Sequence, residues 1–142
     1  MTPASPLCRK YASEPGDSGG AGADGADNDG VDLEAFELVL LRRPDSAPDY
    51  PDAELDRIQR EHMAHLTRLR ESGQVVTNGP VDGQPDPSLR GLAFYRTGSI
   101  EQSRQLAEAD PAVVAGRLVV EIMTWYCPPG TMSLPGRLVT LT

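Results

Sequence analysis

Long apolar runs are absent from this chain of 142 residues. No stretch approaches the roughly 20 apolar residues that a helix needs to cross a bilayer. The first residues also lack the basic and then apolar layout of a secretory signal peptide. We therefore expect a soluble, cytoplasmic protein with no membrane partner.

Basic residues and cysteines are scarce as well. Thirteen basic side chains stand against 21 acidic ones, the net charge is −8, and no basic stripe is present. Proteins bind nucleic-acid backbones through lysine and arginine, so we expect no nucleic-acid partner. Cys8 and Cys127 are too few for a disulfide framework or a zinc site. The sequence also contains no C-x-x-C and no glycine-rich phosphate loop after a predicted strand, and we expect neither a cofactor nor a metal.

Glycine and proline, in contrast, are abundant, with 14 and 13 residues. Residues 15–30 (PGDSGGAGADGADNDG) contain no apolar side chain larger than alanine. Such a segment cannot bury enough surface to offset the entropy of ordering its backbone, about 1 to 2 kcal/mol per residue. We predict that residues 1–33 are a disordered acidic tail, that 34–126 form an α+β domain, and that 127–142 are an extension with one weak strand at 137–141.

Hydrophobic periodicity predicts the elements of this domain. The clearest is a helix over 53–72, in which apolar residues recur at three and four positions, with Asp52 as its N-cap and Gly73 as its stop. Ser99, followed by Gln102 in a capping box, starts a second helix that ends near Ala109. Strands are predicted at 35–43, 74–77, 90–97 and 117–125.

The predicted order is β-α-β-β-α-β, which is that of a ferredoxin-like α+β sandwich with an antiparallel sheet and both helices on one face. The first strand is apolar on both faces, with Leu38 and Leu40 on one and Val39 and Leu41 on the other. Two helices cover only one face of a four-stranded sheet. We predict that a second copy of the chain covers the other face, giving a two-fold homodimer.

His62 lies near the centre of the apolar stripe of the first helix, whereas His65 lies at its edge. A buried imidazole without a partner costs about 1 to 3 kcal/mol. Two interpretations of His62 remain open: a core histidine bonded to a backbone carbonyl, or a general acid or base in a pocket. Asp110, directly before Pro111, is explained by an N-cap of a short helical turn. The H-x-x-H pair lacks a third ligand on its face, so we do not predict a metal site.

Three segments resemble the YCII-related (YciI-like) family in order and spacing. They are HMAHLTRLRESG from His62 to Gly73, the following QVVTNGP, and the later QLAEADPAVVAG. The family has a helix of the form H-x-x-x-L with a glycine eleven residues after the histidine, a short strand ending in Gly-Pro, and a helix ending in Ala-Asp-Pro before a final strand. Counting back eleven residues from Gly73 reaches His62 rather than His65.

The resemblance implies a dimeric α+β barrel of ferredoxin-like subunits, with an active site built around His62 and Asp110. The family's few known activities include the dehydrochlorination of a chlorinated hydroxyquinol, a lyase reaction that needs a base and a pocket but no redox cofactor. Our leading hypothesis is a cofactor-independent lyase or isomerase in which His62 moves a proton and Asp110 orients it, with His65, Gly79 and Pro80 at the substrate pocket. The alternative is a non-catalytic dimer of the same fold, a metabolite-binding or regulatory protein that uses the same cavity to hold a metabolite.

Overall fold

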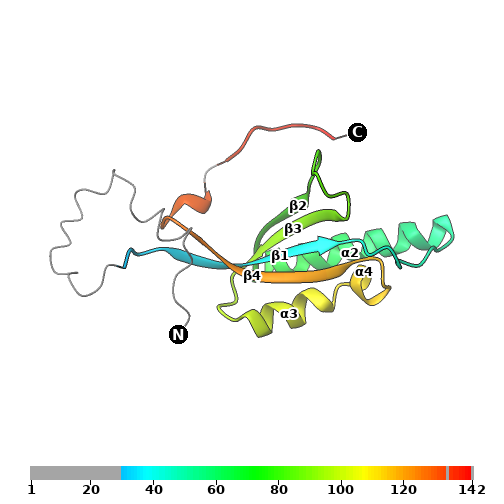
Figure 1. Cartoon of the computed structure of the whole chain (residues 1–142), viewed down its shortest axis with the longest axis horizontal. Helices are drawn as coiled ribbons and strands as arrows, with labels where there is room; N and C mark the ends of the chain where they lie inside the picture. The colour runs from blue at the N-terminus through cyan, green and yellow to red at the C-terminus, as the bar shows by residue number, and fades with distance from the viewer. Residues whose placement is uncertain (1–29, 134, 142) are drawn as a thin grey trace. The chain divides into compact units, whose positions relative to one another are not determined.

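The first strand of the sheet, β1, spans Glu34–Arg42 in the computed structural model, which describes residues 30–133 and 135–141 (Figure 1). It agrees with the predicted strand at 35–43 to within one residue. Val39 and Leu41 are buried, whereas Leu38 and Leu40, on the opposite face, are partly exposed. This alternation follows from the two-residue period of a strand, and it directs one face toward the helices.

Helix α2 spans Asp52–Glu71 and confirms the predicted helix at 53–72. Its N-cap is Pro51, and no side chain caps the helix, so the prediction of Asp52 as N-cap was wrong. Asp52 instead occupies the first helical position, where its negative charge is favourable beside the positive end of the helix dipole. The helix ends before Gly73, which adopts a φ of +83°. Glycine reaches that left-handed conformation without steric cost, as the sequence analysis expected.

Strands β2, Val75–Pro80, and β3, Leu89–Tyr95, pair antiparallel. The prediction ended β2 at residue 77, and this was wrong, because Gly79 and Pro80 continue the ladder opposite Leu92 and Gly91. Proline is tolerated there because β2 is the edge strand of the sheet and needs no amide hydrogen on its outer side. Glycine is required at position 91, since a Cβ added there would lie 2.9 Å from the carbonyl oxygen of Gly79.

Two helices follow β3. Helix α3, Ile100–Glu108, begins at Ser99, whose side chain accepts from the backbone N–H of Gln102, as predicted. Helix α4, Pro111–Val114, is a single turn capped by Asp110. Both caps were foreseen because the capping residue and the amide that it binds are only two or three positions apart.

Strand β4, Val119–Cys127, completes the sheet, and a 3-10 turn follows at Thr131–Ser133. The weak strand expected at 137–141 is absent, because these residues have no regular secondary structure. Leu138 is 97% exposed, and a strand is stable only when a neighbouring strand satisfies its backbone groups. No helix among the described residues is both long and apolar enough to cross a membrane.

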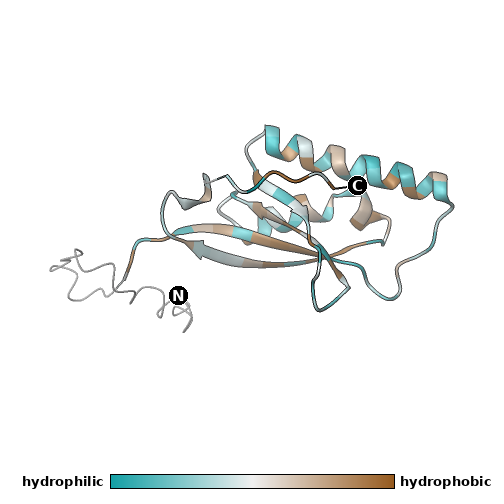
Figure 2. Cartoon of the chain, turned by 90° about the horizontal axis from the view of Figure 1, so that it is seen from above, coloured by the Kyte–Doolittle hydropathy of each residue, from teal (hydrophilic) through white to brown (hydrophobic). Residues whose placement is uncertain are grey.

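The sheet has the order β2-β3-β1-β4, which is the ferredoxin-like arrangement of an α+β fold. All its helices lie on one side of the sheet (Figure 2), within a compact unit that spans Ala35–Trp125. The core between the helices and the sheet is apolar, and it includes Val39, Leu41, Ile58, Leu69, Val75, Ala93, Tyr95, Ala107, Ala112 and Leu118. On the opposite face, Trp125 packs against Phe94 with ring centroids 4.9 Å apart.

Candidate functional site

His62 and Asp110 come together where helix α2 packs against helix α4. His62 lies one helical turn after Ile58, which is buried against the core. Asp110 is held in place by its own role as the N-cap of α4, because its Oδ1 accepts the backbone N–H of Ala112 at 2.8 Å. The cap therefore fixes one oxygen of the carboxylate and leaves the second one, Oδ2, to face α2.

The imidazole of His62 contacts that second oxygen. Its Nδ1 lies 2.7 Å from Asp110 Oδ2, although the two residues are 48 positions apart in the sequence. The side chain of Asp110 is 3% exposed and that of His62 is 12% exposed. A contact this short between an imidazole and a carboxylate, mostly shielded from water, is a charge-assisted hydrogen bond.

The carboxylate determines which ring nitrogen of His62 is left without a hydrogen bond. Because an ionised carboxylate can only accept, Nδ1 of His62 carries the proton toward Asp110. In the neutral imidazole the lone pair then lies on Nε2, which has no hydrogen-bond partner among the residues that the structure describes. This arrangement is that of a general base whose reactive nitrogen remains available, with a negative charge behind it to stabilise the imidazolium.

His65 occupies a different environment. Its Nε2 lies 2.9 Å from the carbonyl oxygen of Leu106 in α3, and the residue is 9% exposed. His65 is thus the core histidine bonded to a backbone carbonyl, an interpretation that the sequence analysis had considered for His62. The expectation that His65 lies at the edge of the buried stripe was wrong, because His65 is bonded to a carbonyl of α3 and shielded from water.

A hollow of about 300 Å³ is lined by residues of α2 and α4, the helices at which the two paired residues lie, although neither His62 nor Asp110 lines it. It is lined by Tyr50, by Glu54, Arg57, Ile58 and Glu61 of α2, and by Pro111, Val114 and Ala115 at α4. Glu61 and Pro111 are the direct neighbours of the two paired residues in the sequence.

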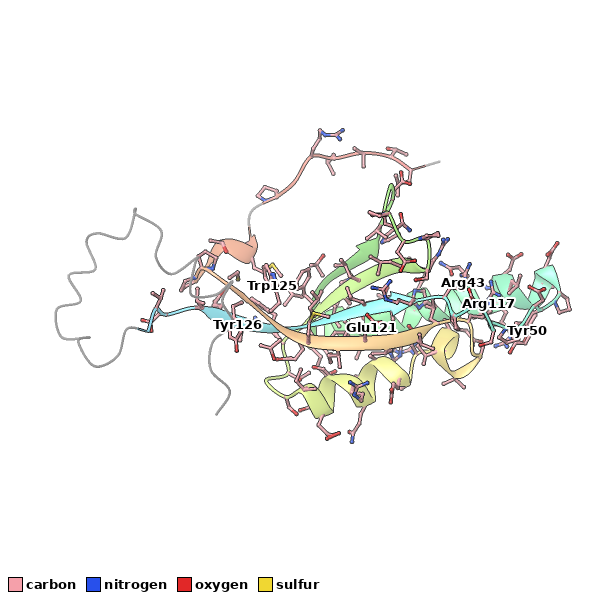
Figure 3. The ribbon with its side chains drawn as sticks, in the orientation of Figure 1. Arg43, Tyr50, Arg117, Glu121, Trp125 and Tyr126 are labelled. Atoms are coloured by element: carbon pink, nitrogen blue, oxygen red, sulfur yellow. The ribbon has the colours of Figure 1, made fainter. Side chains whose placement is uncertain are left out.

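Tyr50 lines this hollow, and the sequence analysis did not identify it. Its hydroxyl donates to the carbonyl oxygen of Ala115 at 2.8 Å, and the residue lies near the end of the sheet (Figure 3). Its one signal was its position as the single aromatic side chain of a proline-rich loop.

The charges in the hollow are already paired. Arg57 lies between Glu54 and Glu61, with an N–O distance of 2.9 Å to the latter. The hydrogen bonds that Arg57 donates to these two carboxylates raise its own pKa, and the one to Glu54 lowers the pKa of Glu54. The hollow therefore carries one negative charge beyond its internal ion pairs.

Gly79 and Pro80 do not lie with these residues. Both belong to the edge strand β2, opposite Leu92 and Gly91, and neither lines the hollow. The two imidazoles of the H-x-x-H pair also have different partners, Asp110 and the carbonyl oxygen of Leu106. Among residues 30–133 and 135–141, no group of three or more histidine, cysteine or acidic side chains is arranged to hold a metal.

Tyr95 is a further residue near the pair that the sequence did not identify. It lies in β3 and is 2% exposed. Burial, together with the negative charge of Asp110, raises the pKa of Tyr95 above its usual range. The sequence marked it only as one position of an alternating strand, because its proximity to Asp110 depends on how α4 is placed over the sheet.

Comparisons with known proteins bear on the whole of this unit. The chain is similar to a solved structure of 5-chloro-2-hydroxyhydroquinone dehydrochlorinase from Burkholderia phenoliruptrix AC1100 in complex with 2,5-dihydroxybenzoquinone, with 21% sequence identity and a TM-score of 0.44. The match covers 65% of this chain and 93% of that one. No curated protein matches the chain in sequence. The model of the YCII-related domain matches residues 37–126, which contain most of β1, both paired residues and nearly all of β4. The chain therefore belongs to the YCII-related domain family.

Proposed function

We propose that this protein is an enzyme of the lyase or isomerase type that moves a proton on a small metabolite. His62 is the proton-transfer group and Asp110 is the residue that orients it. The observation that carries the proposal is the 2.7 Å contact between His62 Nδ1 and Asp110 Oδ2. It supports a histidine that is already held in one tautomer, with Nε2 directed to a ligand.

The reaction type follows from what this pair can do. Imidazole takes a proton from an acidic carbon or hydroxyl at Nε2 and returns it to another atom of the same molecule, or to a leaving group. The negative charge of Asp110 stabilises the imidazolium that forms between the two steps. Both steps use only the side chains of this chain, and the first creates the anionic intermediate that an elimination or an isomerisation requires.

The size of the neighbouring hollow favours a small substrate. Its volume of about 300 Å³ is at the lower limit of ligand pockets in general. Ile58, Pro111 and Val114 contribute apolar surface to it, and its charged side chains are paired with each other. We infer that the substrate is a small, compact molecule, and a hydroxylated aromatic ring or a lactone has suitable dimensions.

The test is turnover by the whole chain on a panel of hydroxylated aromatic compounds, their chlorinated derivatives and lactones. For a compound that is turned over, we expect His62→Gln to lower kcat by about 10² to 10⁴, the usual contribution of a general base. Asp110→Asn should lower kcat with a smaller effect on KM, because it keeps the cap but removes the charge. Asp56→Asn, which changes an exposed acid of α2, is the control and should leave both constants unchanged.

Two results would contradict the enzyme proposal. One is turnover that His62→Gln leaves unchanged. The other is a set of compounds that bind, by calorimetry, without any being converted by the unmodified protein. That second result would support the alternative of a metabolite-binding or regulatory protein, for which the shape of the hollow is sufficient.

We also propose that the protein is a homodimer that pairs through the open face of the sheet, the face opposite the helices. Val119 and Met123 of β4 are 44% and 43% exposed, and Trp125 and Phe94 lie on the same face. Apolar side chains in such number favour burial against a second copy. Sedimentation of the unmodified chain should give twice the monomer mass at micromolar concentration. Met123→Asp should give the monomer mass, whereas Ile100→Asp, on the helical side with 37% exposure, should not. A monomeric unmodified chain would refute the proposal.

A further inference from the structure

Two consecutive arginines at the end of β1 have opposite environments. Arg42 is fully paired, with N–O distances of 3.2 Å to Asp86 and 3.0 Å to Glu121. The backbone N–H of Arg43 donates to the carbonyl oxygen of Ser88 at 2.8 Å, whereas its side chain has no hydrogen bond to any described residue. Among the residues that the structure describes, Arg43 Nε is the one buried side-chain nitrogen or oxygen without a hydrogen-bond partner.

Two further arginines, from different parts of the chain, lie near enough to Arg43 for their charges to act on it. Arg117 precedes β4, and its Nη1 donates to the carbonyl oxygen of Pro48 at 2.9 Å, so its side chain is held near the end of β1 (Figure 3). Arg90, in β3, is exposed and has no ion pair with any described residue. Burial, and then the charges of Arg117 and Arg90, lower the pKa of Arg43. Three guanidinium groups therefore share one end of the sheet.

This cluster is unfavourable as it stands. Like charges repel, and a buried nitrogen that is left without an acceptor loses its hydration without gaining a hydrogen bond. A chain with a net charge of −8 has many carboxylates, yet Asp86 and Glu121 pair with Arg42, and no described carboxylate forms an ion pair with Arg43. The unpaired positive charge is therefore available to a ligand. Groups with two or three oxygens that share a negative charge are those that guanidinium binds best.

We propose that Arg43, Arg90 and Arg117 form a binding site for an oxyanion, the carboxylate or phosphate group of a small metabolite. The outer nitrogens of Arg43 and the exposed guanidinium of Arg90 hold the oxygens. Arg117, anchored on Pro48, adds a fixed positive charge. The three residues take no part in the contact between His62 and Asp110, and the proposal does not depend on the proposed enzymatic function.

The test uses the whole chain and two simple probes, inorganic phosphate and acetate, titrated at constant ionic strength with sodium chloride as the balancing salt. We expect at least one probe to raise Tm in a saturable way, beyond any effect of chloride. A rise in Tm with phosphate alone indicates a phosphorylated ligand, and a rise with acetate alone indicates a carboxylate. A rise with both indicates a site that binds either kind of oxyanion.

Variants connect the response to the cluster. Arg43→Gln and Arg90→Gln should each weaken the apparent affinity by about tenfold or more, which is what the loss of one charge-assisted hydrogen bond produces. Arg43→Lys, which keeps the charge, should retain more affinity than Arg43→Gln. Arg60→Gln removes an exposed positive charge from the middle of α2, where no described residue pairs with it, and should leave the response unchanged.

The same variants give a signature that a purely structural arginine would not. Without phosphate or acetate, Arg43→Gln should have a Tm equal to or above that of the unmodified chain, because it removes the repulsion and the unpaired Nε. The proposal is overturned if neither probe raises Tm beyond chloride. It is also overturned if the response survives both Arg43→Gln and Arg90→Gln, or if Arg60→Gln abolishes it equally. Because Arg90 is exposed, its variant keeps the test valid even if a change at Arg43 prevents folding.

Discussion

Replacing Asp110 with serine separates the two hydrogen bonds that its carboxylate makes. Serine is a good N-cap, and its Oγ can accept the N–H of Ala112 as Asp110 Oδ1 does at 2.8 Å. Its side chain is too short to reach His62, so the 2.7 Å contact is lost. A hydrogen bond to a charged group contributes about 1.5 to 3 kcal/mol, and we expect Asp110→Ser to lower the free energy of unfolding by that amount.

Asp110→Ala removes the cap as well. Loss of an N-cap costs about 1 kcal/mol, so Asp110→Ala should be less stable than Asp110→Ser by about that difference. The assay is urea unfolding followed by the fluorescence of Trp125, the single tryptophan of the chain, which packs on Phe94 within the same compact unit. The slope with urea should be the same for all variants, so that the midpoints report stability.

A double-mutant cycle then isolates the pair. His62→Ala, Asp110→Ser and their combination should give a coupling energy of about 1 to 2 kcal/mol, because each single change leaves one partner without the other. A coupling energy near zero would refute the reasoning, since it would mean that the two side chains do not interact in solution. Equal stability of Asp110→Ser and Asp110→Ala would refute only the role of the cap.

Two other predictions concern the sheet. Gly91→Ala should lower the free energy of unfolding by about 1 to 3 kcal/mol, measured with urea, because its Cβ would lie 2.9 Å from the backbone oxygen of Gly79. Gly79→Ala, whose Cβ meets nothing within 4 Å, should lower it by less than half as much, and equal losses would contradict the close approach of the strands. Tyr95 has a raised pKa in the folded protein, so above about pH 10 the unfolded chain loses this proton first and stability falls as pH rises. Tyr95→Phe should reduce the fall in stability above about pH 10, measured by urea unfolding, and an unchanged slope of stability against pH would contradict this prediction.

Much of the secondary structure was predictable from local patterns. The helical period of α2, the Ser99 cap and the glycine at position 73 each depend on residues within one turn of each other. The errors occurred where the presence or absence of a neighbouring strand decides whether a segment forms a strand. Residues 78–80 extend β2 because β3 lies beside them, and residues 137–141 form no strand because none does.

The two histidines show the limit of a helical wheel. Periodicity places both on or near the buried side of α2, and it ranks His62 as the more central. In the structure His65 is the deeper, bonded to Leu106 of α3. The wheel describes one helix, whereas burial depends on which neighbours are packed over each side of it. The spacing of eleven residues to Gly73 singled out His62 as the functional candidate, and that spacing is also local.

The sequence by itself determined the order of strands and helices, the caps at Ser99 and Asp110, and the identity of His62 and Asp110 as residues to consider, because each rests on short-range patterns or spacings. Only the tertiary structure decided that these two side chains meet across 48 positions, and that Arg43, Arg90 and Arg117 gather at one end of the sheet. The physical reason is that such contacts form when α4 docks on α2 and when β1, β3 and β4 align. Docking and alignment are determined by the packing of the whole core rather than by any one segment.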